Sequence, residues 1–288
     1  MNMTDPAELL EVAVEVARQA AELARSRRLD GVADVGTKST ATDLVTAADR
    51  DVERLIGRLL RAHRPDDAIL GEEFGASRDS GGSAGAGAGD RAGGIAGGTD
   101  GGRVRWVVDP IDGTVNYVYG IPHYAVSIAA EMGGAAVAGV VRNAATGEEW
   151  TAVRGGGAWR AGERLAGSAV TGLDQSLIAT GFAYGSDRRA HQATVLAAIL
   201  PRVRDIRRFG AAALDLCAAA EGRVDAYFEK GLGAWDHAAG GLIATEAGLR
   251  VTGLRGAPAG PNLVLAAPPG VYRQLHDLLV ELDADGGP

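Results

Sequence analysis

Residues 106–114 read WVVDPIDGT. The apolar run WVVD predicts a buried strand, and the proline and glycine after it predict a turn. This turn contains Asp109 and Asp112, two carboxylates that repel each other unless a proton or a cation lies between them. One interpretation is an Asx-type turn in which the acids cap backbone amides. The other is a metal site at the end of the strand.

Three other acidic motifs accompany this turn. GEE at 71–73 follows the apolar run AIL, which predicts another strand. WDHAAG at 235–240 places Asp236 at the start of a predicted helix, where an aspartate alone is typical of an N-cap. DLVTAAD at 43–49 gives Thr46 and Asp49 the spacing of a capping box. Oxygen ligands at several strand ends, without paired histidines or a cysteine cluster, favour Mg²⁺ over zinc.

The rest of the chain predicts an α/β (α+β) protein built from two layered halves. Helices are predicted at about 5–28 and 46–63, and a meander of strands at 123–153. Beyond about residue 155, strands alternate with helices at about 188–199, 211–221 and 236–247. We therefore expect a single domain, 1–288, with an N-terminal α+β half at about 1–153 and a C-terminal α/β half at about 154–288.

The segment 75–103 differs from the rest in composition. It contains twelve glycines among its 29 residues and almost no side chain that can pack in a core. Ordering such a segment costs conformational entropy without burial to offset it. We expect a flexible surface loop. Its GAGAGD run lacks the preceding strand and the following helix that a phosphate-binding loop needs.

Charge and composition exclude several classes of protein. The 37 acids and 29 bases give a net charge of −8, which argues against a nucleic acid or an anionic membrane as partner. No run reaches the roughly 20 apolar residues of a membrane helix, and the amino terminus carries acids where a secretory signal carries bases. We therefore expect a cytoplasmic protein. Cys217 is the single cysteine, and its apolar neighbours predict a buried, inert thiol.

The motifs DLVTAAD, GEE, DPIDGT and WDHAAG occur in the order, and at about the spacing, of the inositol monophosphatase family, which the chain resembles over nearly its whole length. The resemblance implies the layered α/β/α/β/α sandwich of the inositol monophosphatase and fructose-1,6-bisphosphatase superfamily. In that fold an antiparallel sheet comes from the N-terminal half and a second sheet from the C-terminal half. The metal site is expected at their junction, and the protein is expected to form a homodimer.

The resemblance also implies roles for individual residues. Glu72, Asp109 and the Ile111 carbonyl resemble a first metal site, Asp109, Asp112 and Asp236 a second, and Glu72 also faces a weaker third ion. Two to three Mg²⁺ ions are thus expected. Asp49 and Thr114, with Glu72, are the expected catalytic residues, of which the first two take a proton from the nucleophilic water. The backbone amides of Gly113 and Thr114 are expected to hold the phosphate, beside Asp112 and Asp236.

Substrate choice depends on groups that reach the alcohol. Gly210, Ala211 and Ala212 match family positions that do so, and Lys38 matches a lysine of the family's mobile loop. Glu229 follows the predicted strand VDAYF and is expected to accept hydrogen bonds from ring hydroxyls. The simpler interpretation of Glu229 is an exposed acid paired with Lys230 or another base.

The expected activity is Mg²⁺-dependent, lithium-sensitive hydrolysis of a phosphate monoester, with inositol 1-phosphate as the leading substrate. Histidinol phosphate, fructose 1,6-bisphosphate and a 3′-phosphonucleotide are alternatives within the same superfamily. A different class of function also remains open, because some bacterial relatives resemble binding partners of the transcription machinery. That function would survive mutation of the metal site.

Overall fold

The computed structural model describes residues 5–32, 35–38, 44–77 and 103–288. Its helices are α1 (Pro6–Leu29), α2 (Ala47–His63), α3 (Thr114–Tyr119), α4 (Ser186–Ile199), α5 (Ala212–Ala220), α6 (Ala234–Glu246) and α7 (Pro269–Glu281), with short 3-10 turns at Leu173–Gln175 and Leu200–Arg202. The strands before residue 165 are β1 (Gly36–Thr37), β2 (Leu44–Val45), β3 (Ala68–Gly71), β4 (Gly75–Ser77), β5 (Val104–Asp112), β6 (Ala125–Met132), β7 (Ala135–Asn143), β8 (Glu149–Val153), β9 (Gly157–Arg160) and β10 (Glu163–Arg164). Those after it are β11 (Leu177–Thr180), β12 (Asp205–Arg207), β13 (Ala226–Glu229), β14 (Arg250–Thr252) and β15 (Val264–Ala267).

The first helix begins where the sequence predicts. Asp5 precedes α1, and its Oδ1 accepts a hydrogen bond from Ala7 N at 2.9 Å. Pro6 occupies the first helical position, where its missing N–H costs nothing. The buried side chains of α1 recur every three or four residues and form one stripe: Leu9, Ala13, Val16, Ala17, Ala20, Ala21 and Ala24.

Two large sheets organise the molecule. An eight-stranded sheet has the order β10-β9-β8-β7-β6-β5-β3-β4, and a five-stranded sheet has the order β12-β11-β13-β15-β14. Both sheets are mixed, because β3 is parallel to β5 in the first, and β11 is parallel to β12 and β13 in the second. β1 and β2 form a separate two-stranded ribbon.

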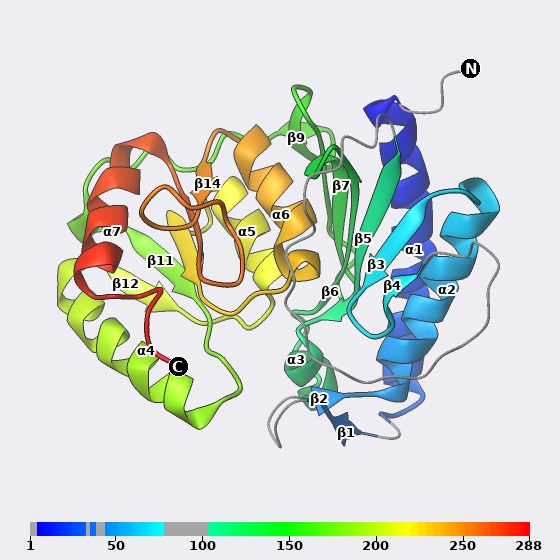
Figure 1. The fold of residues 1–288 in the computed structure, drawn as a ribbon, viewed down its shortest axis with the longest axis horizontal. Helices are drawn as coiled ribbons and strands as arrows, with labels where there is room; N and C mark the ends of the chain where they lie inside the picture. The colour runs from blue at the N-terminus through cyan, green and yellow to red at the C-terminus, as the bar shows by residue number, and fades with distance from the viewer. Residues whose placement is uncertain (1–4, 33–34, 39–43, 78–102) are drawn as a thin grey trace.

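Successive side chains on each strand point to opposite faces of the sheet, and each sheet packs between two layers of helices (Figure 1). On β5, Trp106 and Val108 pack in the core beneath α1 and α2, whereas Val107 faces α5 and α6. On β13, Tyr227 faces the same central helices, and Phe228 packs in the core with α4 and α7. The layers are therefore α1 and α2, the first sheet, α5 and α6, the second sheet, and α4 and α7. The predicted α/β/α/β/α sandwich is confirmed.

Four details differ from the sequence-based expectation. The first sheet is mixed rather than antiparallel, because β3, which ends at the glycine of GEE, runs parallel to β5. The chain then turns into β4, which pairs antiparallel with β3. β9 and β10 extend this sheet beyond residue 153. Residues 75–77 form β4 rather than the start of a loop, and the rest of the predicted loop, 78–102, lies outside the described residues. Helix α7, which buries Val271, Leu275 and Leu279, was not predicted.

Candidate active site

Asp109 and Asp112 both lie on β5, and an irregularity in that strand decides which way they face. Successive residues of a strand point to opposite faces, so side chains three residues apart would point apart in a regular strand. Here Asp109 pairs with Ser127 and Asp112 pairs with Ala125 of β6, which leaves one extra residue on β5 between them. Such a bulge turns the second side chain back to the side of the first. The bulge thus brings both carboxylates to one side.

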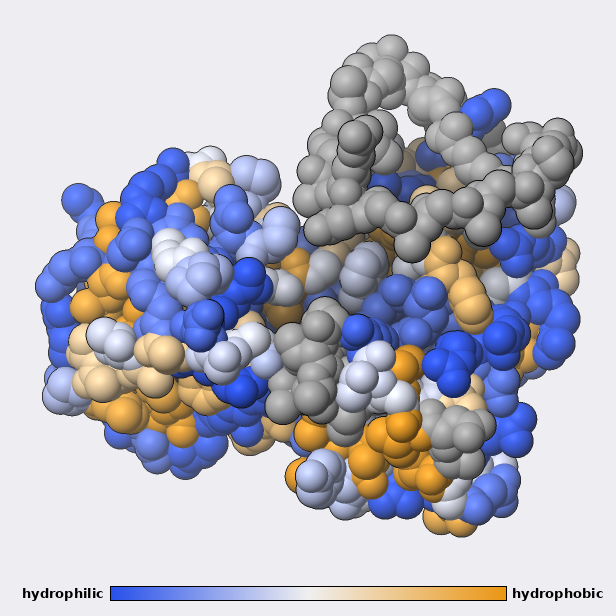
Figure 2. Space-filling model, turned by 60° about the horizontal axis from the view of Figure 1, so that its bottom comes forward, coloured by the Kyte–Doolittle hydropathy of each residue, from blue (hydrophilic) through white to orange (hydrophobic). Residues whose placement is uncertain are grey.

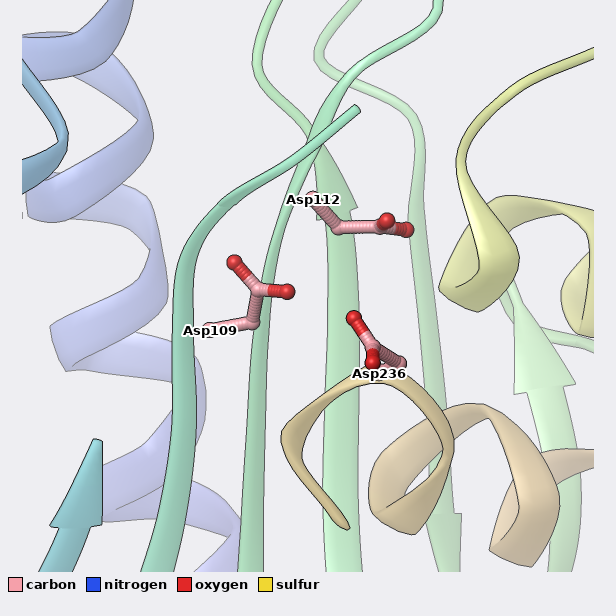
Figure 3. A group of neighbouring side chains, drawn as sticks. All are labelled: Asp109, Asp112 and Asp236. Atoms are coloured by element: carbon pink, nitrogen blue, oxygen red, sulfur yellow. The ribbon is translucent and has the colours of Figure 1, made fainter. Parts of the chain in front are cut away.

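Asp236 comes from a different layer. It is the third residue of α6, and its Oδ2 accepts a hydrogen bond from Gly233 N at 2.6 Å. One oxygen each from Asp109, Asp112 and Asp236 lie within 4.8 Å of one another. Figure 3 shows the three side chains pointing toward one another, two from the end of β5 and one from the first turn of α6. A hard-oxygen donor set of this kind fits Mg²⁺.

This cluster is electrostatically costly without a cation. Asp109 and Asp112 are only 1% and 7% exposed. Burial, followed by the charges of the neighbouring acids, raises the pKa of both carboxyls well above the usual range. Burial and the Glu72 carboxylate raise the pKa of Asp236 to about 8. At neutral pH the cluster therefore retains protons unless a divalent cation takes their place.

Asp49 connects the start of α2 to this turn. Its Oδ2 accepts hydrogen bonds from Thr46 N and Thr46 Oγ1, at 2.8 and 2.6 Å, so the predicted capping box is present. Its Oδ1 lies 3.2 Å from Thr114 Oγ1, which can donate to it. Asp49 is fully buried, and burial raises its pKa. The residue is thus both a helix cap and a partner of Thr114, whereas the sequence alone left these as alternatives.

The turn in WVVDPIDGT has features of both structures predicted for it, the Asx-type turn and the metal site. Asp109 Oδ1 accepts a hydrogen bond from Ile111 N at 3.0 Å, which is the Asx-type turn. The Ile111 carbonyl lies 3.1 Å from Thr114 Oγ1, as the second acceptor within reach of the single hydroxyl proton, and retains another lone pair. Gly113 has φ of 89°, and a Cβ there would lie 3.0 Å from both the Ala211 Cβ and a backbone oxygen. Only glycine fits this position, and α3 begins directly after it.

Asp112 also fixes the start of α5. Its two oxygens accept hydrogen bonds from Ala212 N at 3.2 Å and Ala213 N at 2.7 Å. Ala212, which was predicted to reach the substrate, thus has its backbone amide bonded to Asp112, and the contact of Ala213 was not predicted. Gly210 and Ala212 line the cleft described below, and Ala211 is 2% exposed behind them.

Glu72 stands apart from the three aspartates and pairs with Lys38. Lys38 Nζ lies 2.7 Å from Glu72 Oε1 and also contacts Glu73. Burial alone would lower the pKa of Lys38, but the Glu72 and Glu73 carboxylates raise it overall. Lys38 is thus held at the acidic side of the cleft, beside the predicted metal ligand.

Sequence reasoning missed Glu53, which shapes the GEE turn. Its two oxygens accept hydrogen bonds from Glu73 N at 2.7 Å and Phe74 N at 3.1 Å. A Cβ at Gly71 would lie 1.9 Å from a Glu53 oxygen, so the glycine of GEE makes room for this carboxylate. Glu53 is one helical turn after Asp49 on α2, and this spacing was the available signal.

Glu229 ends β13, as predicted. Tyr227 Oη donates a hydrogen bond to Glu229 Oε2 at 2.7 Å, and burial raises the pKa of Glu229 to about 7. Lys230 instead donates to the main-chain oxygens of Gly286 and Gly287, at 2.5 and 3.3 Å. The simpler interpretation, a Glu229–Lys230 ion pair, is therefore wrong.

These side chains line one cleft of about 840 Å³ between the two halves of the molecule. Figure 2 shows a hollow at this junction. Its walls carry the predicted residues Lys38, Glu72, Asp109, Ile111, Asp112, Gly113, Thr114, Gly210, Ala212, Glu229 and Asp236. They also carry Lys230 and three arginines that the sequence did not single out: Arg188, Arg189 and Arg208. The volume is near the upper end of the roughly 300–1,000 Å³ of small-molecule pockets.

Two other expectations concern the rest of the chain. Cys217 is fully buried, and burial raises its pKa well above the ordinary value, as expected of an inert thiol. Within the described residues, no helix has the length and apolar content needed to span a bilayer.

Comparison with known proteins agrees with this geometry. A model of the inositol monophosphatase family matches residues 5–283. The inositol-1-monophosphatase SuhB of Mycobacterium tuberculosis is 46% identical over 94% of this chain and 93% of that protein. The Nus factor SuhB of Pseudomonas aeruginosa is 40% identical over 86% of each. The solved structure of a Thermotoga maritima IMPase superposes with a TM-score of 0.81 at 28% identity, covering 97% of this chain and all of that one.

Proposed function

The chain belongs to the inositol monophosphatase family, and we propose that it is an Mg²⁺-dependent phosphomonoesterase that converts inositol 1-phosphate and water to myo-inositol and phosphate. The observation that carries this proposal is the buried cluster of Asp109, Asp112 and Asp236 on the wall of a cleft between the two sheets. Each of these carboxylates accepts backbone hydrogen bonds, but three of them within 4.8 Å of one another repel unless protons or a cation lie between them.

The acidic wall is the side of the cleft that carries Asp109, Asp112, Asp236 and Glu72. Its residues would hold the metal ions. Asp109, Asp112 and Asp236 would hold one Mg²⁺, while Glu72 and the Ile111 carbonyl would join Asp109 around another, with two to three ions in all. When bound, Mg²⁺ lowers the pKa of water and neutralises charge on the leaving oxygen. Lys38, whose Nζ lies 2.7 Å from Glu72 Oε1, would give up that contact when Glu72 binds an ion.

Proton removal falls to Thr114 and Asp49. The Thr114 hydroxyl has one proton and two lone pairs, and Asp49 Oδ1 lies 3.2 Å away as an acceptor for that proton. Thr114 can then accept a hydrogen bond from the attacking water and pass a proton to Asp49. As the water oxygen bonds to phosphorus, the bond between phosphorus and the inositol oxygen breaks, and that oxygen takes up a proton.

Two parts of the wall would orient the substrate. The amides of Gly113 and Thr114 precede the hydrogen-bonded part of α3 and would bind the phosphate oxygens. Glu229, with Gly210 and Ala212 nearby on the wall, would accept hydrogen bonds from the ring hydroxyls. Discrimination against histidinol phosphate, fructose 1,6-bisphosphate and 3′-phosphonucleotides depends on these ring contacts, because the metal ligands bind only the phosphate.

A phosphate-release panel over these four substrates tests the proposal. We expect inositol 1-phosphate to be hydrolysed fastest, with Mg²⁺ needed at roughly millimolar concentration. Li⁺ should inhibit, because a small monovalent ion can replace a weakly held divalent one. Full activity in excess chelator contradicts the metal assignment, and a preference for histidinol phosphate contradicts the inositol assignment.

The remaining parts of the proposal concern the whole protein. We treat residues 1–288 as one phosphatase domain that acts in the cytoplasm as a homodimer. A second function is supported by the names of relatives, among them the Nus factor SuhB of Pseudomonas aeruginosa. Binding to the transcription machinery should then persist in Asp112→Asn, which disables the metal cluster. A pull-down of RNA polymerase with wild type and variant measures this, and loss of binding in the folded variant contradicts it.

A further inference from the structure

Asn116 is a buried residue near the cleft to which the proposed function gives no task. It lies on α3, two residues after Thr114, and is 7% exposed. Its Nδ2 donates two hydrogen bonds, to the main-chain oxygens of His123 and Phe209, both at 2.8 Å. Because both acceptors are carbonyls, the amino group of the side-chain amide must face them, and both of its protons are used. Asn116 thus connects the N-terminal half to the C-terminal half through one group.

The main chains of the two halves pack against each other beside this amide. Gly210, in the C-terminal half, has φ of 95°, and a Cβ there would lie 3.1 Å from Asn116 Nδ2. A Cβ at Gly113, in the N-terminal half, would lie 3.2 Å from the Gly210 oxygen. A side chain at either glycine would therefore push the two segments apart. Asn116 holds the halves together at a point where their backbones meet.

The loop that Asn116 holds belongs to the basic wall, the side of the cleft that the C-terminal half contributes. This wall carries three cations and the positions proposed above to contact the ring: Arg188, Arg208, Lys230, Gly210, Ala212 and Glu229. Thr114 and the bulge of β5 lie on the opposite segment. The distance between the reacting phosphate and the ring contacts therefore depends on how residues 209–212 sit against residues 112–114.

Two further contacts hold the same loop, and they differ from those of Asn116. Asp112 accepts hydrogen bonds from backbone amides at the start of α5, but it is also an expected metal ligand, so an ion competes for its oxygens. His123 Nε2 lies 3.3 Å from Asp215 Oδ1, slightly beyond the usual hydrogen-bond range, and its ring lies 5.3 Å from that of Phe209. Asn116 supplies two short hydrogen bonds for which no metal ion competes.

We propose that Asn116 is a positioning residue, which aligns the ring contacts of the basic wall with the phosphate bound at the aspartates. Among the described residues, Asn116 is not one that lines the cleft, so it acts through the backbone of Phe209 and Gly210. The inference rests on the proposed function, because it requires the two halves to bind two parts of one substrate. Without the Asn116 amide the loop shifts while the aspartate cluster stays assembled. An inositol phosphate then binds less well, and an ester without ring hydroxyls is unaffected.

Asn116→Ala tests the inference on two substrates, inositol 1-phosphate and an aryl phosphate. We expect KM for inositol 1-phosphate to rise roughly tenfold, while its kcat and both constants for the aryl phosphate stay within about threefold. The rise should also be smaller in a Glu229→Ala background, because part of the ring recognition is already lost there. A residue that affects only folding would change neither the selectivity nor this coupling.

Asn143→Ala is the matched control. Asn143 is likewise a buried asparagine, 3% exposed, and its Nδ2 donates to the Pro122 oxygen at 3.3 Å, in the loop that contains His123. Its substitution should lower Tm, as Asn116→Ala should, but leave the ratio of the two KM values unchanged. The comparison separates positioning of the loop from stability of the fold.

Asn116→Ser, which keeps one hydroxyl donor, replaces Asn116→Ala if the alanine variant does not fold. Three results overturn the positioning role: equal losses on both substrates, losses that add fully to those of Glu229→Ala, or failure of both Asn116 variants to fold. Absence of phosphate release from inositol 1-phosphate by wild type is a different result, which overturns the proposed function instead.

Discussion

The two walls of the cleft carry opposite charges and are built in opposite ways. The acidic wall fixes its carboxylates through buried hydrogen bonds to backbone amides, such as those of Ala212 and Ala213 to Asp112. The basic wall holds Arg188 and Lys230 through main-chain oxygens of residues 286–288. Amides favour the charged form of an acid, and carbonyls favour the charged form of a base. Both walls therefore fix their charged side chains through the main chain, but only the acidic wall brings three carboxylates within 4.8 Å of one another, which is unfavourable without protons or a cation between them.

The acidic wall should be the more sensitive to single substitutions. Asp112→Asn and Asp236→Asn keep the size of the side chain but remove a charged ligand, so kcat for inositol 1-phosphate should fall at least about a hundredfold. Asp205→Asn, at an exposed position on β12, is the matched control and should leave kcat unchanged. Steady-state kinetics measure kcat, and circular dichroism establishes whether each variant is folded. If both cleft variants proved unfolded, the aspartates would be structural and the comparison would fail.

Glu53 should help to position Glu72, a residue of the acidic wall, through the backbone of the GEE turn. Glu53→Gln can satisfy only one of the two amides of the GEE turn, so Glu72 should be positioned less well and the Mg²⁺ concentration for half-maximal activity should rise roughly tenfold. Asp51→Asn, a change on the same helix at a half-buried carboxylate that pairs with Arg27, should not alter it. Calorimetric titration with Mg²⁺ gives a second readout. An unchanged Mg²⁺ affinity in folded Glu53→Gln would leave Glu53 with a purely structural role.

Glu229 separates ring recognition from phosphate chemistry. Glu229→Ala should raise KM for inositol 1-phosphate by roughly tenfold, because an acceptor of hydrogen bonds from ring hydroxyls is lost. The hydrolysis of an aryl phosphate, which has no such hydroxyls, should change far less. Tyr227→Phe, which removes only the hydrogen bond to Glu229, is the graded comparison. Equal losses on both substrates would remove Glu229 from ring recognition.

The smallest expected effect is on stability. The pKa of Asp236 is about 8 in the folded chain, against an ordinary value of 3.8, so between these values the folded state binds more protons than the unfolded state. Stability should therefore fall as pH rises through this window. In excess chelator we expect Tm to drop by a few degrees between about pH 5 and about pH 8, with Mg²⁺ restoring it mainly at the higher pH. Asp236→Asn should flatten the dependence. A chelated protein whose Tm rises over this range would contradict the electrostatic account.

The acidic wall could be predicted from sequence because its residues occur in short motifs at strand and helix ends. WVVDPIDGT and WDHAAG each identify their aspartates, and the layered fold follows from the alternation of strands and helices. The orientation of Asp112 could not be predicted, since it depends on a bulge in the pairing of β5 with β6. The basic wall could not be predicted from sequence either. Arg188 and Lys230 are far apart in sequence and occur in no motif, so only the fold brings them together.

The central helices α5 and α6 pack between the two sheets. The first sheet ends at Arg164, but α6, which covers its inner face and supplies Asp236, begins only at Ala234. Contacts of such high sequence separation form late, because a long loop must close before they contribute. During synthesis the apolar inner face of the first sheet would remain uncovered until the ribosome has released about the first four-fifths of the chain, a stage at which chaperone capture or aggregation competes with folding. Because the site is shared between two halves, the nascent chain passes through a stage at which it is prone to aggregation, before any catalysis begins.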